Sequence, residues 1–153
     1  MVYIETTVVS YLAATRSRDV VVAGHQRITR DWWDSRNRFE LVVSQAVLDE
    51  ASRGDTRASA RRLALLAGIP VLTLGNEVIE LAERLVQRGA VPVKARSDAL
   101  HISVTAVNRV TYLVTWNCAH IANAGVRGKI EEVCRAAGLQ APIICTPEEL
   151  MEA

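Results

Sequence analysis

Short apolar runs alternate with amphipathic stretches along this chain. Five runs rich in β-branched residues predict strands, at residues 1–4, 41–43, 71–74, 111–116 and 142–145. The segments between them repeat apolar residues at helical spacing, and several start at Ser, Asp or Asn and end at Gly. Strands that alternate with helices predict an α/β protein with a central, mostly parallel sheet of about five strands, covered by helices on both faces.

The composition fits a single globular domain that spans residues 1–153. Half of the residues (50%) are hydrophobic, 23% are charged, and no apolar run approaches the length of a membrane span. The three cysteines form neither a CxxC motif nor an even set, and no signal peptide precedes the first strand. We therefore expect a cytoplasmic protein without membrane contact. The net charge of +1 excludes the overall basicity of many nucleic-acid-binding proteins but leaves local basic patches open.

The most informative stretch runs from Lys94 to His120. Ser97 is the predicted N-cap of a helix with Asp98 in its first turn, and the strand that follows ends before Asn117. The helix before a parallel strand starts at the carboxyl edge of the sheet, and the strand returns to that edge. We therefore expect Asp98 and Asn117 on one rim, where open α/β folds bind ligands. A first-turn carboxylate is also favoured by the helix dipole, so Asp98 alone does not decide between structure and function.

Two further acids are expected at this rim. Glu5 ends the first strand, and Glu50 shares the inward face of its helix with Val47, whereas Asp49 points outward. Two carboxylates ~4 Å apart repel by roughly 4 kcal/mol at an effective dielectric constant of 20, so three of them either shift their pKa values or bind a cation. Because these ligands offer only oxygen and no His/Cys cluster has zinc spacing, Mg²⁺ or Mn²⁺ is favoured over zinc.

Four short segments follow one another along the chain: YIETTVVSYL, VLDEASRG, SDALHISVTA and YLVTWN. In their order and spacing the chain resembles the PIN-domain ribonucleases, and among these the VapC toxins of type II toxin–antitoxin modules. The resemblance implies a three-layer α/β/α PIN-like fold and a Mg²⁺- or Mn²⁺-dependent endoribonuclease. Such an enzyme hydrolyses RNA phosphodiester bonds with a metal-bound water, leaving a 3′-hydroxyl and a 5′-phosphate. It also implies a VapB-type antitoxin as partner and a homodimer.

Carried over by position, the resemblance makes Glu5, Glu50 and Asp98 the metal ligands, and these three with Asn117 the catalytic residues. Two positions depart from the family pattern. Glu5 stands where aspartate is usual, and Asn117 stands where the Thr-x-Asp pattern has an acid. A neutral amide adds no charge, so we expect a second metal to bind weakly.

Further residues are expected to support these acids or touch the RNA: Thr6, Thr7, Thr115 and His101. Thr6 or Thr7 would orient a carboxylate or contact a phosphate. His101 lies one turn after Asp98 and on the same side of the helix, so it either hydrogen-bonds near the site or packs at the edge of the core.

A second interpretation stays open, that of a catalytically weak or inactive PIN-fold module that binds RNA or an antitoxin without turnover. A helical stripe of Val21, His25, Ile28 and Trp32 predicts that Trp32 faces inward and that His25 is a packed histidine rather than a ligand. Trp33 then becomes the candidate surface for a partner.

Overall fold

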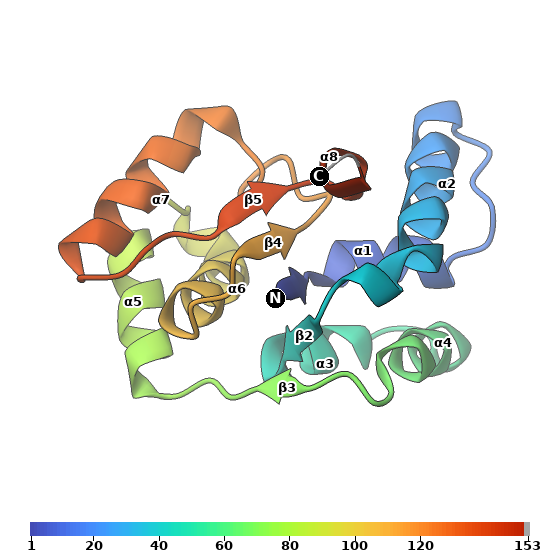
Figure 1. The fold of residues 1–153 in the computed structure, drawn as a ribbon, viewed down its shortest axis with the longest axis horizontal. Coiled ribbons are helices and arrows are strands. Elements are labelled where there is room, and N and C mark those ends of the chain that lie inside the picture. Colours follow the sequence, from blue (N-terminus) through green and yellow to red (C-terminus); the bar gives the residue numbers. More distant parts are fainter. Residues whose placement is uncertain (152–153) are drawn as a thin grey trace.

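The computed structural model describes residues 1–151, which form an α/β fold around one five-stranded sheet. Figure 1 shows how the helices surround this sheet. The strands are β1 (Val2–Ile4), β2 (Leu41–Ser44), β3 (Val71–Leu72), β4 (Tyr112–Val114) and β5 (Ile143–Cys145). They lie in the order β3-β2-β1-β4-β5, and every neighbouring pair is parallel. The predicted strands and their parallel arrangement are confirmed.

Helices cover both faces of the sheet, as predicted. The first half of the chain supplies α1 (Thr6–Ala13), α2 (Val20–Asp34), a 3₁₀ turn (Arg36–Arg38), α3 (Gln45–Ala51) and α4 (Thr56–Leu66). The second half supplies α5 (Asn76–Gln87), a 3₁₀ turn (Val93–Ala95), α6 (Arg96–Val107), α7 (Ala124–Ala136) and α8 (Pro147–Met151). Helices α5, α6 and α7 lie on one side of the sheet, and α1, α2 and α8 lie on the other (Figure 1). The fold is thus a three-layer α/β/α arrangement.

The strand order reverses direction at β1. From β1 the chain proceeds through β2 to β3 on one side, and later through β4 to β5 on the other. The carboxyl ends of β1 and β4 are therefore neighbours at a topological switch point, where open α/β sheets leave a crevice for ligands. The residues that follow these two strands are Glu5 and Thr115.

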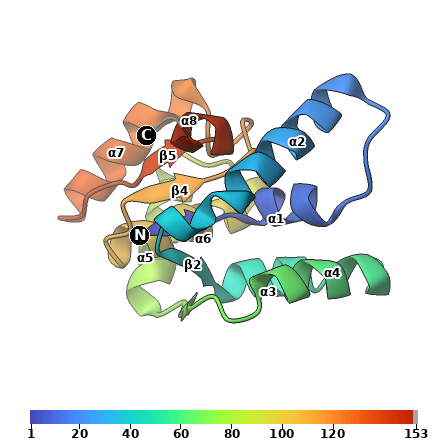
Figure 2. The ribbon, with the colours of Figure 1, turned by 45° about the vertical axis from the view of Figure 1, so that its right-hand side comes forward.

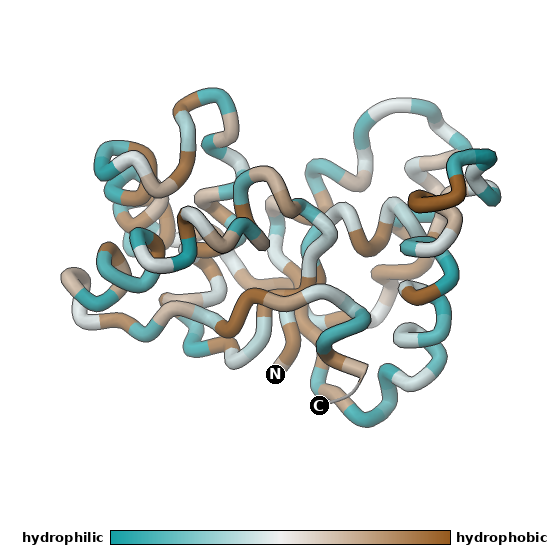
Figure 3. The backbone as a smooth tube through the Cα atoms, turned by 90° about the horizontal axis from the view of Figure 1, so that it is seen from above, coloured by the Kyte–Doolittle hydropathy of each residue, from teal (hydrophilic) through white to brown (hydrophobic). Residues whose placement is uncertain are grey.

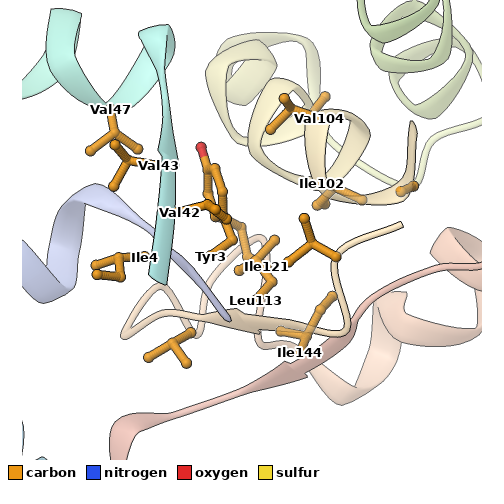
Figure 4. Packing of buried hydrophobic residues seen from close by; sticks show 14 of the residues in the cluster. Tyr3, Ile4, Val42, Val43, Val47, Ile102, Val104, Leu113, Ile121 and Ile144 are labelled. Atoms are coloured by element: carbon orange, nitrogen blue, oxygen red, sulfur yellow. The ribbon is translucent and has the colours of Figure 1, made fainter. Parts of the chain in front are cut away.

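Strand β1 is buried on both faces, as expected for the centre of a parallel sheet. Apolar stretches of the backbone gather in the middle of the molecule and hydrophilic ones at its periphery (Figure 3). The Tyr3 ring lies between Val43 and Val47 on one side and Ile102 of α6 on the other (Figure 4). Side chains alternate along a strand and Glu5 keeps an extended backbone, so Tyr3 and Glu5 face the same layer.

Helix α6 runs through the interior instead of lying on the surface. From Ala99 to Ala106 every side chain except that of Leu100 is buried. Asp98 lies in the first turn, as predicted, but the prediction of Ser97 as N-cap is wrong. The 3₁₀ turn Val93–Ala95 leads directly into the helix, so the cap is Ala95 and Ser97 is an exposed first-turn residue.

Helix α2 begins beyond the end of α1, and its first turns project from the rest of the protein (Figure 2). Val21 in these turns is 66% exposed, so the predicted stripe does not reach that far. Further along, Trp32 is fully buried, as predicted. His25 stacks on Trp116 with ring centroids 4.1 Å apart, which confirms it as a packed histidine. Within residues 1–151, the helices are too short or too polar to cross a membrane.

Candidate metal centre

The Glu5 side chain, at the end of β1, is hydrogen-bonded to Thr115 at the end of β4. Glu5 is 3% exposed, and its Oε2 accepts hydrogen bonds from the Thr7 amide (3.1 Å), the Thr7 hydroxyl (2.5 Å) and the Thr115 hydroxyl (2.7 Å). The Thr7 hydroxyl also accepts a hydrogen bond from the Trp116 amide (2.9 Å). Thr7 and Thr115 therefore hold the carboxylate in one orientation, with Oε1 facing away from both.

His101 of α6 meets this carboxylate from the neighbouring layer. Its side chain is completely buried, and Nε2 lies 3.2 and 3.3 Å from the two oxygens of Glu50 and 4.0 Å from Oε1 of Glu5. On the other side of the ring, Nδ1 lies 2.7 Å from the Tyr3 hydroxyl, which is 2.7 Å from the Ser44 hydroxyl. The imidazole thus links two acids to a buried tyrosine–serine pair.

Glu50 reaches the cluster from α3. It is half-buried, whereas Asp49 beside it is exposed and accepts a hydrogen bond from Gln45, so the predicted inward direction of Glu50 is confirmed. One ligand atom each from Glu5, Glu50 and His101 lies within 4.8 Å of the others. Two ligand atoms each ~2.1 Å from one ion are roughly 3 to 4 Å apart, so these separations fit a shared cation.

Oε1 of Glu5 is the carboxylate oxygen of the cluster that lacks a hydrogen bond among residues 1–151. Within the same residues, the buried Oγ1 of Thr6 has no partner at normal hydrogen-bond geometry, but it lies near enough to Glu50 to help lower the pKa of that carboxyl. Buried polar groups in native proteins are normally paired, so unpaired ones indicate a ligand or water. The donor set therefore fits a divalent cation.

Electrostatics couple the three side chains. Burial alone would lower the pKa of His101, but the hydrogen bond to Glu50 and the charges of Glu5, Glu50 and Asp98 outweigh it and raise that pKa above its ordinary value. Burial alone would raise the pKa of Glu50, but the hydrogen bond and charge of His101, together with Thr6 and Arg53, outweigh it and the pKa is lowered. The pair thus favours an imidazolium beside a carboxylate.

This pair gives the metal-free protein a specific pH dependence. The raised pKa of His101 stabilises the fold below 6.5, its ordinary value, and that contribution is lost as pH rises through the folded-state pKa. The lowered pKa of Glu50 stabilises the fold above 4.5 and is lost as pH falls. In EDTA, the excess unfolding free energy of the unmodified protein over His101→Gln should therefore be greatest between pH 4.5 and 6.5. Urea titrations across pH measure it, and a gap that grows above pH 8 would refute the pairing.

Asp98 and Asn117 lie beside the cluster rather than in it. The half-buried Asp98 has a raised pKa, chiefly because of burial, while the Asn117 amide and the nearby histidines partly offset the rise. Asp98 influences the pKa of His101, but it is not in the group of three that could share an ion. Asn117 is held by the His120 amide, which donates to its Oδ1 at 3.1 Å. The sequence prediction of Asp98 and Asn117 as site residues stays a prediction.

The structure combines the two roles that the sequence left open for His101, since the side chain is both buried and hydrogen-bonded to Glu50. It also adds Tyr3 and Ser44, which the sequence pattern did not single out and which contact the other nitrogen of the ring in a chain of hydrogen bonds. The sequence does contain one indication that His101 is buried and paired. The segment around it is apolar or small on every side, which is typical of a buried helix, and a buried histidine needs a hydrogen-bond partner.

Neither the protein-family models, nor the curated proteins, nor the solved structures yield a match to this chain. A functional assignment therefore has to start from the cluster at the switch point. What the cluster offers is two carboxylates from separate elements, one imidazole and an orienting shell of threonines.

Proposed function

We propose that this chain is a divalent-metal-dependent endoribonuclease of the PIN-domain kind that acts in the cytoplasm as the toxin of a toxin–antitoxin pair. The observation that carries the proposal is the convergence of Glu5, Glu50 and His101 at the carboxyl edge of the sheet, from three distant parts of the chain. The order of the four sequence segments that resemble this family supports it. Together, the cluster and the resemblance favour phosphodiester hydrolysis over other reactions that an acidic metal site could support.

The residues of the cluster and those around it would have different roles. Glu5 and Glu50 would hold the cation, while Thr7 and Thr115 keep Glu5 in position through its Oε2. Asp98 would enclose the site from the first turn of α6, as the resemblance implies. A bound divalent cation would supply Lewis acidity, by lowering the pKa of water and offsetting the charge of the phosphodiester.

A local basic surface supports a polyanionic substrate in spite of the net charge of only +1. Four arginines line one groove along α2 and the loop before it: Arg16, Arg18, Arg27 and Arg30. Arginine presents a planar fork that matches phosphate oxygens. The groove also contains Asp31 and Asp34, so its charge is mixed but positive in sum.

The proposal is tested with single-stranded RNA whose two ends are blocked, so that only internal cleavage gives products. The purified protein should cleave it with Mn²⁺ or Mg²⁺, stop in excess EDTA, and leave 5′-phosphate ends. Asp98→Asn should lose this cleavage while remaining folded. Full activity in EDTA, or in Asp98→Asn, contradicts the proposal.

A binding module without turnover is the second candidate, and two observations favour it. His101 already provides Glu50 with a counter-charge, and Asn117 supplies an amide where the family pattern has an acid. Such a module would bind the blocked RNA, or an antitoxin, without releasing fragments in any divalent cation. The same assay therefore separates the two candidates.

Asn117→Asp should tighten Mn²⁺ binding and increase cleavage, because it adds a carboxylate near Asp98 where the site is short of charge. We expect roughly a tenfold lower dissociation constant by calorimetry, a typical size for a change beside the metal ligands. Asn123→Asp is the matched control, since Asn123 is the N-cap of α7 and aspartate caps equally well. Equal Mn²⁺ affinity in Asn117→Asp and the unmodified protein would show that the site does not lack charge.

The proposed partner is a VapB-type antitoxin, and we propose a homodimer as the assembly. Trp33 is half-buried, and the Arg36 guanidinium lies 4.5 Å from the centre of its ring. A tryptophan beside an arginine is the kind of side-chain pair that anchors interfaces. Trp33→Ala should therefore weaken antitoxin binding with little change in melting temperature.

A further inference from the structure

The position of His101 bears on which cation the site takes, a question that rests on the proposed metal-dependent function. Carboxylates alone would suit Mg²⁺, which prefers oxygen ligands in a strict octahedron and keeps much of its water. His101, however, directs Nε2 between Glu5 and Glu50, at 4.0 and 3.2 Å from their nearer oxygens. A nitrogen in such a place changes the chemistry of the site.

We propose that His101 is the third ligand, through Nε2, of a divalent transition-metal ion that Glu5 and Glu50 share, so that the site selects Mn²⁺, Fe²⁺ or Zn²⁺ over Mg²⁺. Imidazole suits the transition metals, whereas Mg²⁺ gains little from it. The all-oxygen site predicted from the sequence is thereby replaced by a site with two carboxylates and one imidazole. Asp98 lies outside this group and is not a ligand of the ion in this proposal.

The surroundings of the ring match those of metal-binding histidines. Such histidines donate the N–H of their other nitrogen to a nearby acceptor, which fixes the orientation of the ring. Here Nδ1 lies 2.7 Å from the Tyr3 hydroxyl, which can accept this N–H and donate its own hydrogen to Ser44 Oγ, 2.7 Å away. Ligation then requires Nε2 to release to solvent the proton that now lies toward Glu50. The lone pair that this frees binds the cation, and the second ring proton stays on Nδ1.

Burial supports the same assignment. The His101 side chain is 0% exposed and is held in the interior helix α6, so the ring cannot swing into solvent when a cation arrives. Oε1 of Glu5, in a side chain that is 4% exposed, has no hydrogen bond among residues 1–151 and faces the same space. A cation placed there would give Oε1 of Glu5 a partner and would replace the direct contact between Nε2 and Glu50.

The first test uses the unmodified protein. With ¹⁵N-labelled histidine, nitrogen NMR follows the three histidines of the chain, His25, His101 and His120, during titration with Zn²⁺. Nε2 of His101 should shift to the position of a metal-bound nitrogen, and His25 should not. Stoichiometric Zn²⁺ binding at the acids without that shift overturns the proposal.

The second test compares ions by calorimetry. The unmodified protein should bind Mn²⁺ at least roughly tenfold more tightly than Mg²⁺, and His101→Gln should remove most of that preference while changing Mg²⁺ affinity little. His25→Gln, which alters a packed histidine, is the matched control and should keep the preference. Equal affinity for both ions in the unmodified protein also overturns the proposal.

The outcome can be separated from that of the proposed function. If His101 ligates Zn²⁺ but the blocked RNA stays intact, the metal assignment holds and the nuclease proposal fails. If RNA is cleaved with Mg²⁺ while Nε2 of His101 never shifts, the nuclease proposal holds and this assignment fails.

Discussion

Glu5→Gln should abolish cation-dependent RNA cleavage and leave the protein folded. Oε2 of Glu5 accepts its hydrogen bonds from Thr7 and Thr115, and the amide oxygen of a glutamine can accept the same bonds. The amide NH₂ group then falls where Oε1 now faces His101 and Glu50, so a ligand is exchanged for a donor. The substitution keeps shape and packing but removes one buried charge.

The expected loss of cleavage rate is large. A divalent cation contributes several kcal/mol of transition-state stabilisation, and about 4 kcal/mol corresponds to roughly a thousandfold in rate. Single-turnover cleavage of the blocked RNA in Mn²⁺ measures the rate, and circular dichroism confirms the fold. Asp49→Asn is the matched control, because Asp49 is a neighbouring but exposed acid whose partner is Gln45. Equal losses in both variants would show that general charge, and not the cluster, matters.

Trp32→Ala should destabilise the fold by about 3 to 5 kcal/mol, the usual cost of removing a large buried aromatic side chain. Trp32 is 0% exposed and packs against Trp33 and Phe39, with ring centroids 6.2 and 6.4 Å away. Because domains of this size are stable by only about 5 to 15 kcal/mol, the variant should unfold at much lower urea concentration. Urea titration followed by circular dichroism measures the change.

Two matched variants separate packing from polarity at this position. The indole nitrogen of Trp32 is buried without a hydrogen-bond partner among residues 1–151, and such a group costs about 1 to 3 kcal/mol. Trp32→Phe keeps most of the packing and removes that unpaired donor, so it should cost far less than Trp32→Ala. Trp33→Ala should also cost less, because Trp33 is half-buried. A loss as large in Trp33→Ala as in Trp32→Ala would mean that α2 is oriented differently.

The fold could be predicted from the sequence because each strand is a short apolar run between clear helix boundaries. The same logic placed Glu50 inward and Asp49 outward, since residues on one face of a helix repeat at fixed offsets. It also placed Glu5 at the end of β1, where the sheet edge lies. These predictions depend only on local periodicity and on the rule that parallel strands end at one edge.

His101 could not be placed in the same way. Helix α6 is buried on nearly all sides, so it has no polar face against which an inward residue can be recognised. Its distance to Glu50 depends on how α6 packs over β1 and α3, which no local pattern encodes. The start of α6 was missed for a related reason, since the 3₁₀ turn before it has no capping side chain.

Both the proposed activity and the choice of ion depend on whether Glu5, Glu50 and His101 bind a metal ion. Crystals grown with Mn²⁺ and measured near the manganese absorption edge would locate the ion directly by its anomalous signal. We expect one strong peak within ~2.1–2.3 Å of Oε1 of Glu5, a carboxylate oxygen of Glu50 and Nε2 of His101. A peak elsewhere, or no peak while His101 keeps its hydrogen bond to Glu50 at saturating Mn²⁺, would contradict the proposed metal site.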